Sequence, residues 1–235
     1  MLVAGFPAGS WGTNCYVVAP GAGEQCVVID PGHEAADGVA DLVREHRLQP
    51  VAVLLTHGHV DHTFSVVPVC GRYGVAAYIH PEDRGQLADP ASGLGLAPGQ
   101  LVMPGLTLAE PDEVIELTGH DVLALAGLEL TVDHAPGHTR GSVTFRLATD
   151  VLFSGDLLFA GSIGRTDLPG GSYDEMLASL ARVILPLPDE MAVLSGHGGA
   201  TTIGAERATN PYLVEAAAAT AGSGGTTPAP SARGW

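Results

Sequence analysis

Short apolar runs, several of them rich in β-branched residues, recur along the chain and are bounded by glycine and proline. Such runs predict β-strands, and the Pro-Gly pairs at positions 20–21 and 31–32 predict turns between them. Several of the later runs end next to a histidine or an aspartate. The strands expected from this pattern cover residues 2–6, 15–19, 26–29, 51–55, 142–147, 151–156 and 192–197.

Two segments place apolar residues three or four positions apart, which is the spacing of one face of an α-helix. The second segment begins with Ser172 and Glu175, a pair that forms a capping box. The periodic residues are Val39, Leu42, Val43 and His46 in the first segment and Leu177, Leu180, Ala181 and Ile184 in the second. Strands and helices alternate in each half of the chain, which predicts a layered α/β domain. The Gly- and Pro-rich segment 89–111 is expected to form a loop.

A cluster of metal-binding residue types follows the predicted strand at 51–55. The chain reads Thr-His-Gly-His-Val-Asp-His over residues 56–62. Neutral imidazole and carboxylate are the ligands that borderline divalent ions such as zinc prefer. In an extended segment His57 and His59 point to the same side, because they are two positions apart. Asp61 and His62 follow the turn and can face a second ion, so this run predicts a metalloenzyme.

Further ligand types stand beside three later predicted strands. His138 lies in a Pro/Gly turn before one strand, Asp156 ends the next, and His197 ends a third between glycines. In layered α/β folds the carboxyl ends of strands are where sites are built. Glycines beside each ligand allow the backbone to approach closely. We therefore expect these side chains to join the cluster at 57–62.

The resulting ligand set is sufficient for two metal ions. The expected ligands are His57, His59 and His138 for the first ion, Asp61, His62 and His197 for the second, and Asp156 as a bridge. Two cations about 3.5–4 Å apart need an anion between them, which Asp156 supplies. Each ion keeps an open position for a shared water or hydroxide, which distinguishes a catalytic site from a structural one.

These motifs, in this order, resemble those of the metallo-β-lactamase-fold hydrolase superfamily. The motifs are the run at 56–62 and the later Pro-Gly-His-Thr, Gly-Asp-Leu-Leu-Phe and Ser-Gly-His-Gly elements. Segments 159–171, 201–207 and 210–212 are similar to the short, single-domain, glyoxalase II-like branch, whose members resemble hydroxyacylglutathione hydrolase. The resemblance covers roughly residues 1–215. It implies an αβ/βα sandwich of four layers, with two mixed sheets back to back and helices outside.

The resemblance also implies a dinuclear hydrolase. A hydroxide bridging two divalent ions would attack the thioester of an S-(2-hydroxyacyl) conjugate such as S-lactoylglutathione. Asp61 would position its metal and assist proton transfer, while Arg165 and Arg140 could contact an anionic part of the substrate. Zinc is the expected metal, and iron and manganese are compatible with the same ligands.

This sequence departs from full-length glyoxalase II in the part that binds glutathione. That enzyme carries a C-terminal helical domain, whereas only 38 residues follow His197 here. The lysines that often bind the glutathione carboxylates are also missing, since the chain has no lysine. A conjugate of another thiol, such as mycothiol, is therefore an alternative substrate.

Three other functions are compatible with the same motifs. A persulfide dioxygenase would hold one iron through His57, His138 and Asp156. A lactonase would use the dinuclear site on an ester, and a non-catalytic metal-binding protein would keep the ligands without turnover. Class-defining β-lactamases often have a cysteine where this chain has Asp156, which counts against that activity.

Composition and charge indicate the number of domains, the cellular location and the class of partner. The 235 residues, 46% of them hydrophobic, suit one domain at 1–215, followed by an Ala/Gly/Ser/Thr/Pro-rich tail at 216–235 that is expected to be disordered. No apolar run of 18 residues and no signal peptide is visible, so a soluble cytoplasmic protein without membrane contact is expected. A net charge of −16 disfavours nucleic-acid binding. The oligomeric state is left open.

Some residues near the motifs have open roles. Asp30, at the end of a predicted strand, either orients a ligand histidine or belongs to the turn at Pro31-Gly32. His134 is a candidate for orienting a ligand, and His80 is expected to be structural. Three cysteines, Cys15, Cys26 and Cys70, form no C-x-x-C pair and are expected to be buried, reduced hydrophobic residues.

Overall fold

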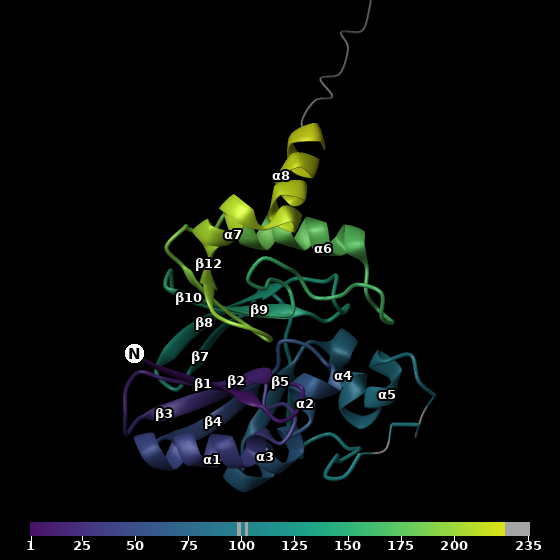
Figure 1. Ribbon diagram of the computed structural model, residues 1–235. Helices are drawn as coiled ribbons and strands as arrows, with labels where there is room; N and C mark the ends of the chain where they lie inside the picture. The colour runs from purple at the N-terminus through teal and green to yellow at the C-terminus, as the bar shows by residue number, and fades with distance from the viewer. Residues whose placement is uncertain (98–99, 102, 224–235) are drawn as a thin grey trace, which may run out of the picture.

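The computed structural model describes residues 1–97, 100–101 and 103–223. Its strands form two six-stranded mixed sheets, which lie back to back in the centre of Figure 1. The first sheet has the spatial order β1 (Leu2–Ala8), β2 (Thr13–Ala19), β3 (Gln25–Ile29), β4 (Gln49–Leu54), β5 (Ala76–Ile79), β6 (Val114–Glu116). The second has the order β12 (Thr201–Thr202), β11 (Ala192–Ser195), β10 (Val151–Gly155), β9 (Val143–Leu147), β8 (Leu128–His134), β7 (Val122–Leu125).

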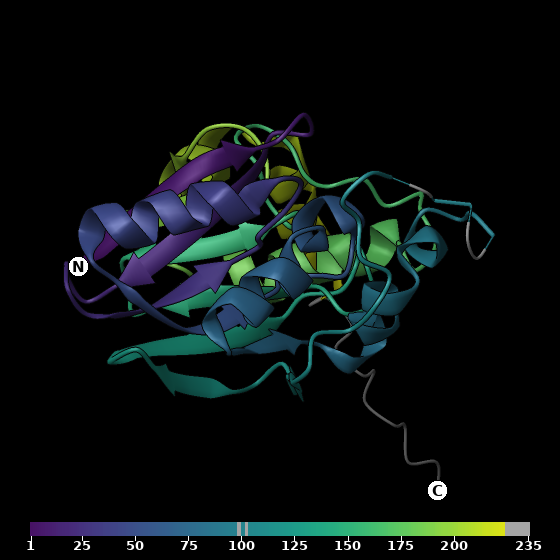
Figure 2. The ribbon, with the colours of Figure 1, turned by 90° about the horizontal axis from the view of Figure 1, so that it is seen from below.

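Helices cover the outer face of each sheet. Below the first sheet lie α1 (Ala35–His46) and α3 (Val66–Tyr73), which Figure 2 shows crossing the strands. Above the second lie α6 (Tyr173–Ser179), a π-helical turn η1 (Leu180–Ile184), α7 (Ile203–Thr209) and α8 (Pro211–Ser223). The predicted α/β sandwich of four layers is confirmed. Among the described residues, no helix has the length and apolarity needed to cross a membrane.

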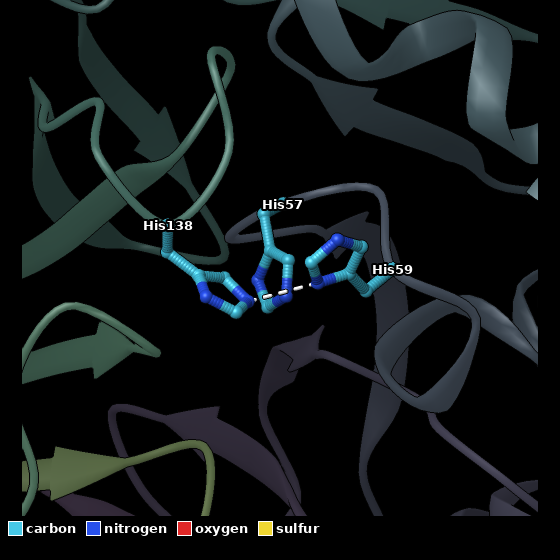
Figure 3. A group of neighbouring side chains, drawn as sticks. All are labelled: His57, His59 and His138. Atoms are coloured by element: carbon cyan, nitrogen blue, oxygen red, sulfur yellow. Dashed lines mark hydrogen bonds between the residues drawn. The ribbon is translucent and has the colours of Figure 1, made fainter. Parts of the chain in front are cut away.

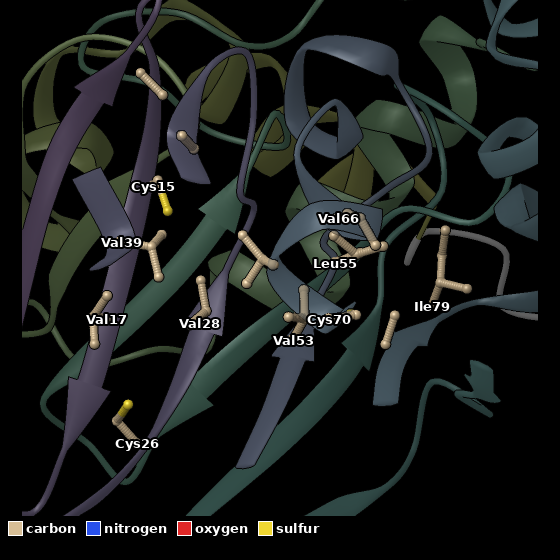
Figure 4. Close-up of a cluster of buried hydrophobic side chains, with 14 of the residues drawn as sticks. Cys15, Val17, Cys26, Val28, Val39, Val53, Leu55, Val66, Cys70 and Ile79 are labelled. Carbon is tan, nitrogen blue, oxygen red and sulfur yellow. The ribbon is translucent and has the colours of Figure 1, made fainter. Parts of the chain in front are cut away.

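The alternation of side chains along central strands builds two cores at once. On β2, Cys15 and Val17 pack under the helices of the first sheet, whereas Val18 faces the second sheet. This follows from the two-residue period of a strand with both faces buried. Figure 4 shows the outer core, where Val28 and Val53 continue the same row.

The cysteines are part of this packing. Cys15, Cys26 and Cys70 are buried and unpaired, and burial raises the pKa of the Cys26 and Cys70 thiols to about 12. Thiols held in the protonated form are poor nucleophiles and poor metal ligands. The expectation of buried, reduced cysteines is confirmed.

The predicted second helix differs from expectation in two details. It begins at the Ser172 cap, where the hydroxyl accepts from the Glu175 amide at 3.3 Å. The Ser172 amide donates to the Gly137 carbonyl instead of to Glu175, so only half of the capping box forms. The regular α-helix stops at Ser179, and the rest of the periodic segment is the π-helical turn η1.

Two segments expected to be irregular contain helix. Within 89–111, residues Pro90–Gly93 form the one-turn helix α5, because proline suits a first helical position; residues 98, 99 and 102 lie outside the described residues. Helix α8 runs past the expected domain end at 215 through Ala216, which is fully buried. An alanine run favours helix over coil. Residues 224–235 of the predicted tail lie outside the described residues.

Candidate metal centre

The seven predicted ligands come together where the ends of strands from both sheets meet. The first sheet supplies His57 and His59 after β4, and the short helix α2 (Val60–Thr63) carries Asp61 and His62. From the second sheet come His138 in the turn between β8 and β9, Asp156 after β10 and His197 after β11. These seven residues form three overlapping groups whose ligand atoms lie within 4.8 Å of one another.

The first group consists of the three histidines expected for the first metal. Nδ1 of His59 lies 2.8 Å from Nε2 of His138. The His57 ring stands edge-on to both, with centroid distances of 4.9 Å to His59 and 4.7 Å to His138. Figure 3 shows nitrogens of all three rings turned toward one another. His57 and His59 thus reach the same side of an extended segment, as their spacing predicts.

The second group combines Asp61, His62 and His197. Oδ2 of Asp61 lies 3.0 Å from Nε2 of His197 and 3.6 Å from Nε2 of His62. Asp156 stands between the two groups, with Oδ1 3.2 Å from His62 and Oδ2 3.5 Å from Nε2 of His138. One carboxylate therefore contacts histidines of both predicted sets, which is the position needed by a bridging ligand.

The buried atoms of this cluster fit divalent cations. Within the described residues, Nε2 of His57, Nε2 of His62 and Oδ1 of Asp156 are buried without a hydrogen-bond partner. A buried polar atom left unpaired destabilises the folded protein by about 1–3 kcal/mol. A cluster of such atoms is therefore rare, and it indicates a binding site for an ion. Imidazole and carboxylate together form a donor set suited to zinc and related ions. Gly196 leaves the necessary room, since a Cβ there would overlap Oδ1 of Asp156.

The surroundings of His57 and His59, in the first group, keep both imidazoles in the neutral form that can bind a metal ion. Burial, together with the neighbouring imidazoles, lowers the pKa of His57 well below its ordinary value. Burial also lowers the pKa of His59 to about 4. Both rings are therefore neutral at neutral pH, and neutral imidazole is the form that binds metal.

In the second group, charged neighbours outweigh the effect of burial on the pKa values. Burial would lower the pKa of His62, but Asp156 and Asp61 outweigh it and raise the pKa well above its ordinary value. Burial would raise the pKa of both carboxyl groups, but the surrounding histidines hold each of these pKa values below the ordinary range. Without metal, His62 thus carries a proton between two carboxylates, and a bound cation would take the place of that charge.

Asp30 orients His62, one of the predicted ligands. Its carboxylate lies 2.9 Å from Nδ1 of His62 and accepts hydrogen bonds from the Thr56 amide at 2.8 Å and the Thr56 hydroxyl at 2.6 Å. The residue has a φ of 49°, which few residues other than glycine adopt without a compensating interaction. Of the two roles left open by the sequence, the structure shows the orienting one.

Asp83 was not anticipated from the sequence. It lies on α4 (Pro81–Ala88), is 1% exposed, and accepts three hydrogen bonds. The donors are the Gly58 amide at 2.9 Å, the Thr139 hydroxyl at 2.6 Å and the Gly141 amide at 2.9 Å. These donors belong to the two loops that carry the first group of histidines, so Asp83 links both loops.

His80 and His134 support the same region without touching a ligand. The His80 ring caps α4 by accepting from the Glu82 amide at 3.4 Å, and it stacks on His134 at 4.2 Å. Nε2 of His134 lies 2.8 Å from the Arg140 carbonyl oxygen. His80 is therefore structural, and His134 holds the segment after His138 rather than the ligand itself.

A pocket of about 330 Å³ opens beside the cluster. Leu94, Phe159 and Leu168 form apolar parts of its wall. The wall segment 159–162 is held by a buried glutamate, because Glu206 accepts from the Gly161 amide at 2.7 Å. Asn210 donates to the Ser162 carbonyl oxygen at 3.0 Å, so the segments 201–207 and 210–212 support the wall of the pocket.

The two predicted substrate-binding arginines lie in different surroundings. Arg165 lines the pocket, but its guanidinium forms two hydrogen bonds with Asp167, at 2.7 and 2.8 Å, and its carbonyl oxygen lies 2.7 Å from Nδ1 of His138. Arg140 lines a neighbouring pocket of about 370 Å³ with Glu82 and Pro169. Among the described residues, no acidic side chain pairs with Arg140.

Comparison with known proteins identifies a matching family and similar proteins. A family model described as the metallo-beta-lactamase superfamily matches residues 8–197. An uncharacterised protein of Mycobacterium leprae is 50% identical over 216 residues, covering 91% of this chain and 99% of that protein. The hydroxyacylglutathione hydrolase GloC of Haemophilus influenzae is 34% identical over 212 residues, covering 88% of this chain and 95% of GloC.

Solved structures have the same fold. The B3 metallo-beta-lactamase BLEG-1 is 39% identical with a TM-score of 0.81, covering 90% of this chain and 99% of that one. The protein TTHA1623 in a di-iron-bound form is 37% identical with a TM-score of 0.71, covering 91% of this chain and 100% of that one. With a family model spanning most of its length and the His/Asp cluster between its two sheets, the chain belongs to the metallo-β-lactamase superfamily.

Proposed function

We propose that the protein is a glyoxalase II-like thioesterase that cleaves an S-(2-hydroxyacyl) conjugate of a small thiol. The observation that carries this proposal is the convergence of seven imidazole and carboxylate side chains beside an open pocket. Support for the thioester comes from GloC, a relative of similar length that is named for this activity. The proposed substrate is S-lactoylglutathione or an analogue built on another thiol, such as mycothiol.

The ligand assignment follows the geometry of the two groups. His57, His59 and His138 would hold one divalent ion, Asp61, His62 and His197 the other, and Asp156 would contact both. Zinc is the proposed metal, and the di-iron form of TTHA1623 makes iron the first alternative. When bound, such ions provide Lewis acidity and make water a nucleophile at neutral pH.

The protein side chains would orient the reactants. Asp61 stays ionised because His62 and His197 lower its pKa, and its Oδ2 accepts a 3.3 Å hydrogen bond from Thr13. A fixed, charged carboxylate can accept a hydrogen bond from the attacking water and hold it in line with the carbonyl carbon. Leu94, Phe159 and Leu168 would exclude bulk water from the acyl group.

Arg140 is the better candidate for the anionic end of the substrate. Arg165 is already neutralised by Asp167, whereas Arg140 has no acidic partner among the described residues and faces a pocket next to the metal centre. Gly93 and Leu94 are adjacent in the chain and line the two pockets separately, so one elongated substrate could reach both.

The deciding experiment is steady-state hydrolysis of S-lactoylglutathione by protein loaded with zinc, followed by the loss of the thioester absorbance. A kcat/KM above about 10⁴ M⁻¹s⁻¹, the lower end of the usual enzymatic range, supports the proposal. A far lower value rejects glutathione as the thiol. The same assay with S-lactoyl mycothiol then separates a wrong thiol from a wrong reaction.

A second candidate activity is β-lactam hydrolysis, favoured by the 39% identity to BLEG-1 over nearly all of that chain. The same ligand set could also support lactone hydrolysis, or persulfide oxidation at one iron held by His57, His138 and Asp156. Turnover of a chromogenic cephalosporin, of a lactone, or oxygen uptake with a persulfide by the iron-loaded protein would identify each one. Full metal loading without turnover in any assay would indicate a binding protein.

A further inference from the structure

One buried histidine of the metal centre lacks the outer partner that the others have. In His57, His62 and His138, the nitrogen facing away from the cluster lies within hydrogen-bond distance of an oxygen. Those contacts are Thr56 Oγ1 at 3.1 Å, Asp30 Oδ2 at 2.9 Å and the Arg165 carbonyl oxygen at 2.7 Å. His59 is the exception, because its Nε2 is buried and has no hydrogen-bond partner among the described residues.

The orientation of the His59 ring is reversed relative to the other three. Its Nδ1 faces Nε2 of His138 at 2.8 Å, so its Nε2 is the outer nitrogen. Figure 3 shows that this nitrogen points away from both His57 and His138. When Nδ1 gives its lone pair to a metal ion, the ring proton resides on Nε2, and Nε2 becomes a donor that needs an acceptor.

An acceptor without a donor lies next to it. Oε1 of Gln86 is also buried, and it has no hydrogen-bond partner in the part of the chain that the structure describes. The Gln86 side chain passes over Gly58, where an added Cβ would lie 3.0 Å from the Cβ and Cδ of Gln86. At Gly93, an added Cβ would overlap Oε1 of Gln86 and would lie 3.1 Å from Cδ2 of His59, the carbon bonded to Nε2. The two unpaired groups therefore border the same small space.

We propose that Gln86 is a positioning residue for the first metal: its amide oxygen accepts the Nε2 proton of His59 when Nδ1 binds the ion. This contact would fix the tautomer and the angle of the His59 ring, as the partners of His57, His62 and His138 do for theirs. Gln86 lies one helical turn after Asp83 on α4, so a single helix would set both the loop and the ring. The inference concerns metal binding and does not depend on the substrate.

The test compares two substitutions of Gln86 in the full chain. Gln86→Met keeps the length of the side chain and removes the acceptor, whereas Gln86→Glu keeps an acceptor at the same place. Gln49→Met, at an exposed position of β4, is the matched control. Zinc affinity is measured by competition with a chromophoric chelator, and the stability of the metal-free protein by urea unfolding.

Loss of an outer partner typically lowers metal affinity by about 10–100-fold. In Gln86→Met we expect this decrease for the zinc ion held by His59, whichever of the two binding steps fills that site. Gln86→Glu should restore the affinity, and Gln49→Met should leave it unchanged. Metal-free Gln86→Met should be as stable as the parent protein or more stable, because an unpaired buried oxygen has been removed. A side chain that merely fills space would instead lose stability without metal.

The proton itself gives an independent signature. In the zinc-loaded protein labelled with ¹⁵N-histidine, the His59 Nε2–H should be visible as a slowly exchanging resonance that shifts in Gln86→Glu and is lost in Gln86→Met. Unchanged zinc affinity in Gln86→Met would overturn the inference. It would equally be overturned by an affinity loss that Gln86→Glu fails to restore, or by a His59 Nε2 resonance that Gln86→Met leaves in place.

Discussion

The Thr139 hydroxyl donates a 2.6 Å hydrogen bond to Asp83, a residue 56 positions earlier in the chain. The same carboxylate accepts from the amide of Gly58 on one loop and from the amide of Gly141 on the other. His57 and His59 come from the first sheet and His138 from the second, so the geometry of their shared group depends on how these loops meet. Asp83 is thus a fixed link between the two halves of the predicted first metal site.

Asp83→Asn should weaken both the fold and the first metal site. The amide group can accept on one side only, so at least one of the three donors would lose its buried acceptor. We expect the free energy of unfolding to fall by about 1–3 kcal/mol. Urea unfolding of the metal-free protein measures this loss, and chelator competition should show weaker zinc binding in the same variant.

The matched control is Asp112→Asn, which makes the same chemical change at an exposed position. It should leave both stability and zinc affinity within error of the parent protein. If Asp83→Asn behaved like this control, the hydrogen bonds of Asp83 would not hold the loops together.

The sequence predicts that the seven candidate side chains come together, because each one is a close neighbour of an apolar run. His57 follows β4, Asp156 follows β10 and His197 follows β11, so local pattern alone places them at strand ends. The strands buried on both faces are predicted for the same reason. In contrast, β6 and β7 are short and partly exposed, and their apolar pattern is too weak to distinguish them from loops.

Local sequence patterns do not reveal the supporting residues, because the partners of these residues are remote in sequence. Asp83 bonds to residues that lie 25, 56 and 58 positions away. Asp83 lies outside every predicted motif, and an acidic residue in the first turn of a helix such as α4 is common for electrostatic reasons alone. Gln86 has no motif at all, and its relation to His59 depends on which ring nitrogen faces the cluster.

Asp30→Asn should weaken the second metal site more than the fold. Asparagine tolerates the left-handed backbone conformation at this position, so the turn should survive. Its side chain can still accept from Thr56, but the negative charge beside Nδ1 of His62 is lost. We expect a decrease of about 10–100-fold in the affinity for the second zinc ion. Stepwise zinc titration checks this, and an equal loss for both ions would assign Asp30 a general structural role instead.

Metal binding should release a proton at neutral pH. The pKa of His62 is raised above its ordinary value by Asp156 and Asp61, so the metal-free protein carries a proton there that a cation must displace. Burial lowers the pKa of His57 well below its ordinary value and that of His59 to about 4, so these two rings release none. Zinc affinity of the second site should therefore rise with pH across the neutral range. Calorimetry at pH 7 in buffers of different ionisation enthalpy counts the protons, and a count of zero would contradict the raised pKa of His62.

Arg140→Ala and Arg165→Ala should affect the KM for the thioester differently. A charge-assisted hydrogen bond contributes about 1.5–3 kcal/mol, so losing one from Arg140 should raise KM by roughly ten- to a hundredfold. Arg165 is already bound to Asp167 by two hydrogen bonds, and its removal should have a smaller effect. The kcat should change little in both variants, because a contact remote from the carbonyl is equally strong in the ground and transition states.

The control for this pair is Arg44→Ala, which breaks an exposed ion pair with Asp41 on α1, a helix that contributes none of the described residues lining either pocket. Its KM should match that of the parent protein. A larger effect at Arg165 than at Arg140 would mean that Asp167 releases the guanidinium when substrate binds, and the anionic end would then lie in the pocket beside the metals. An unchanged KM in Arg140→Ala would remove the neighbouring pocket from the substrate-binding site, because no other cation lines it among residues 1–97, 100–101 and 103–223.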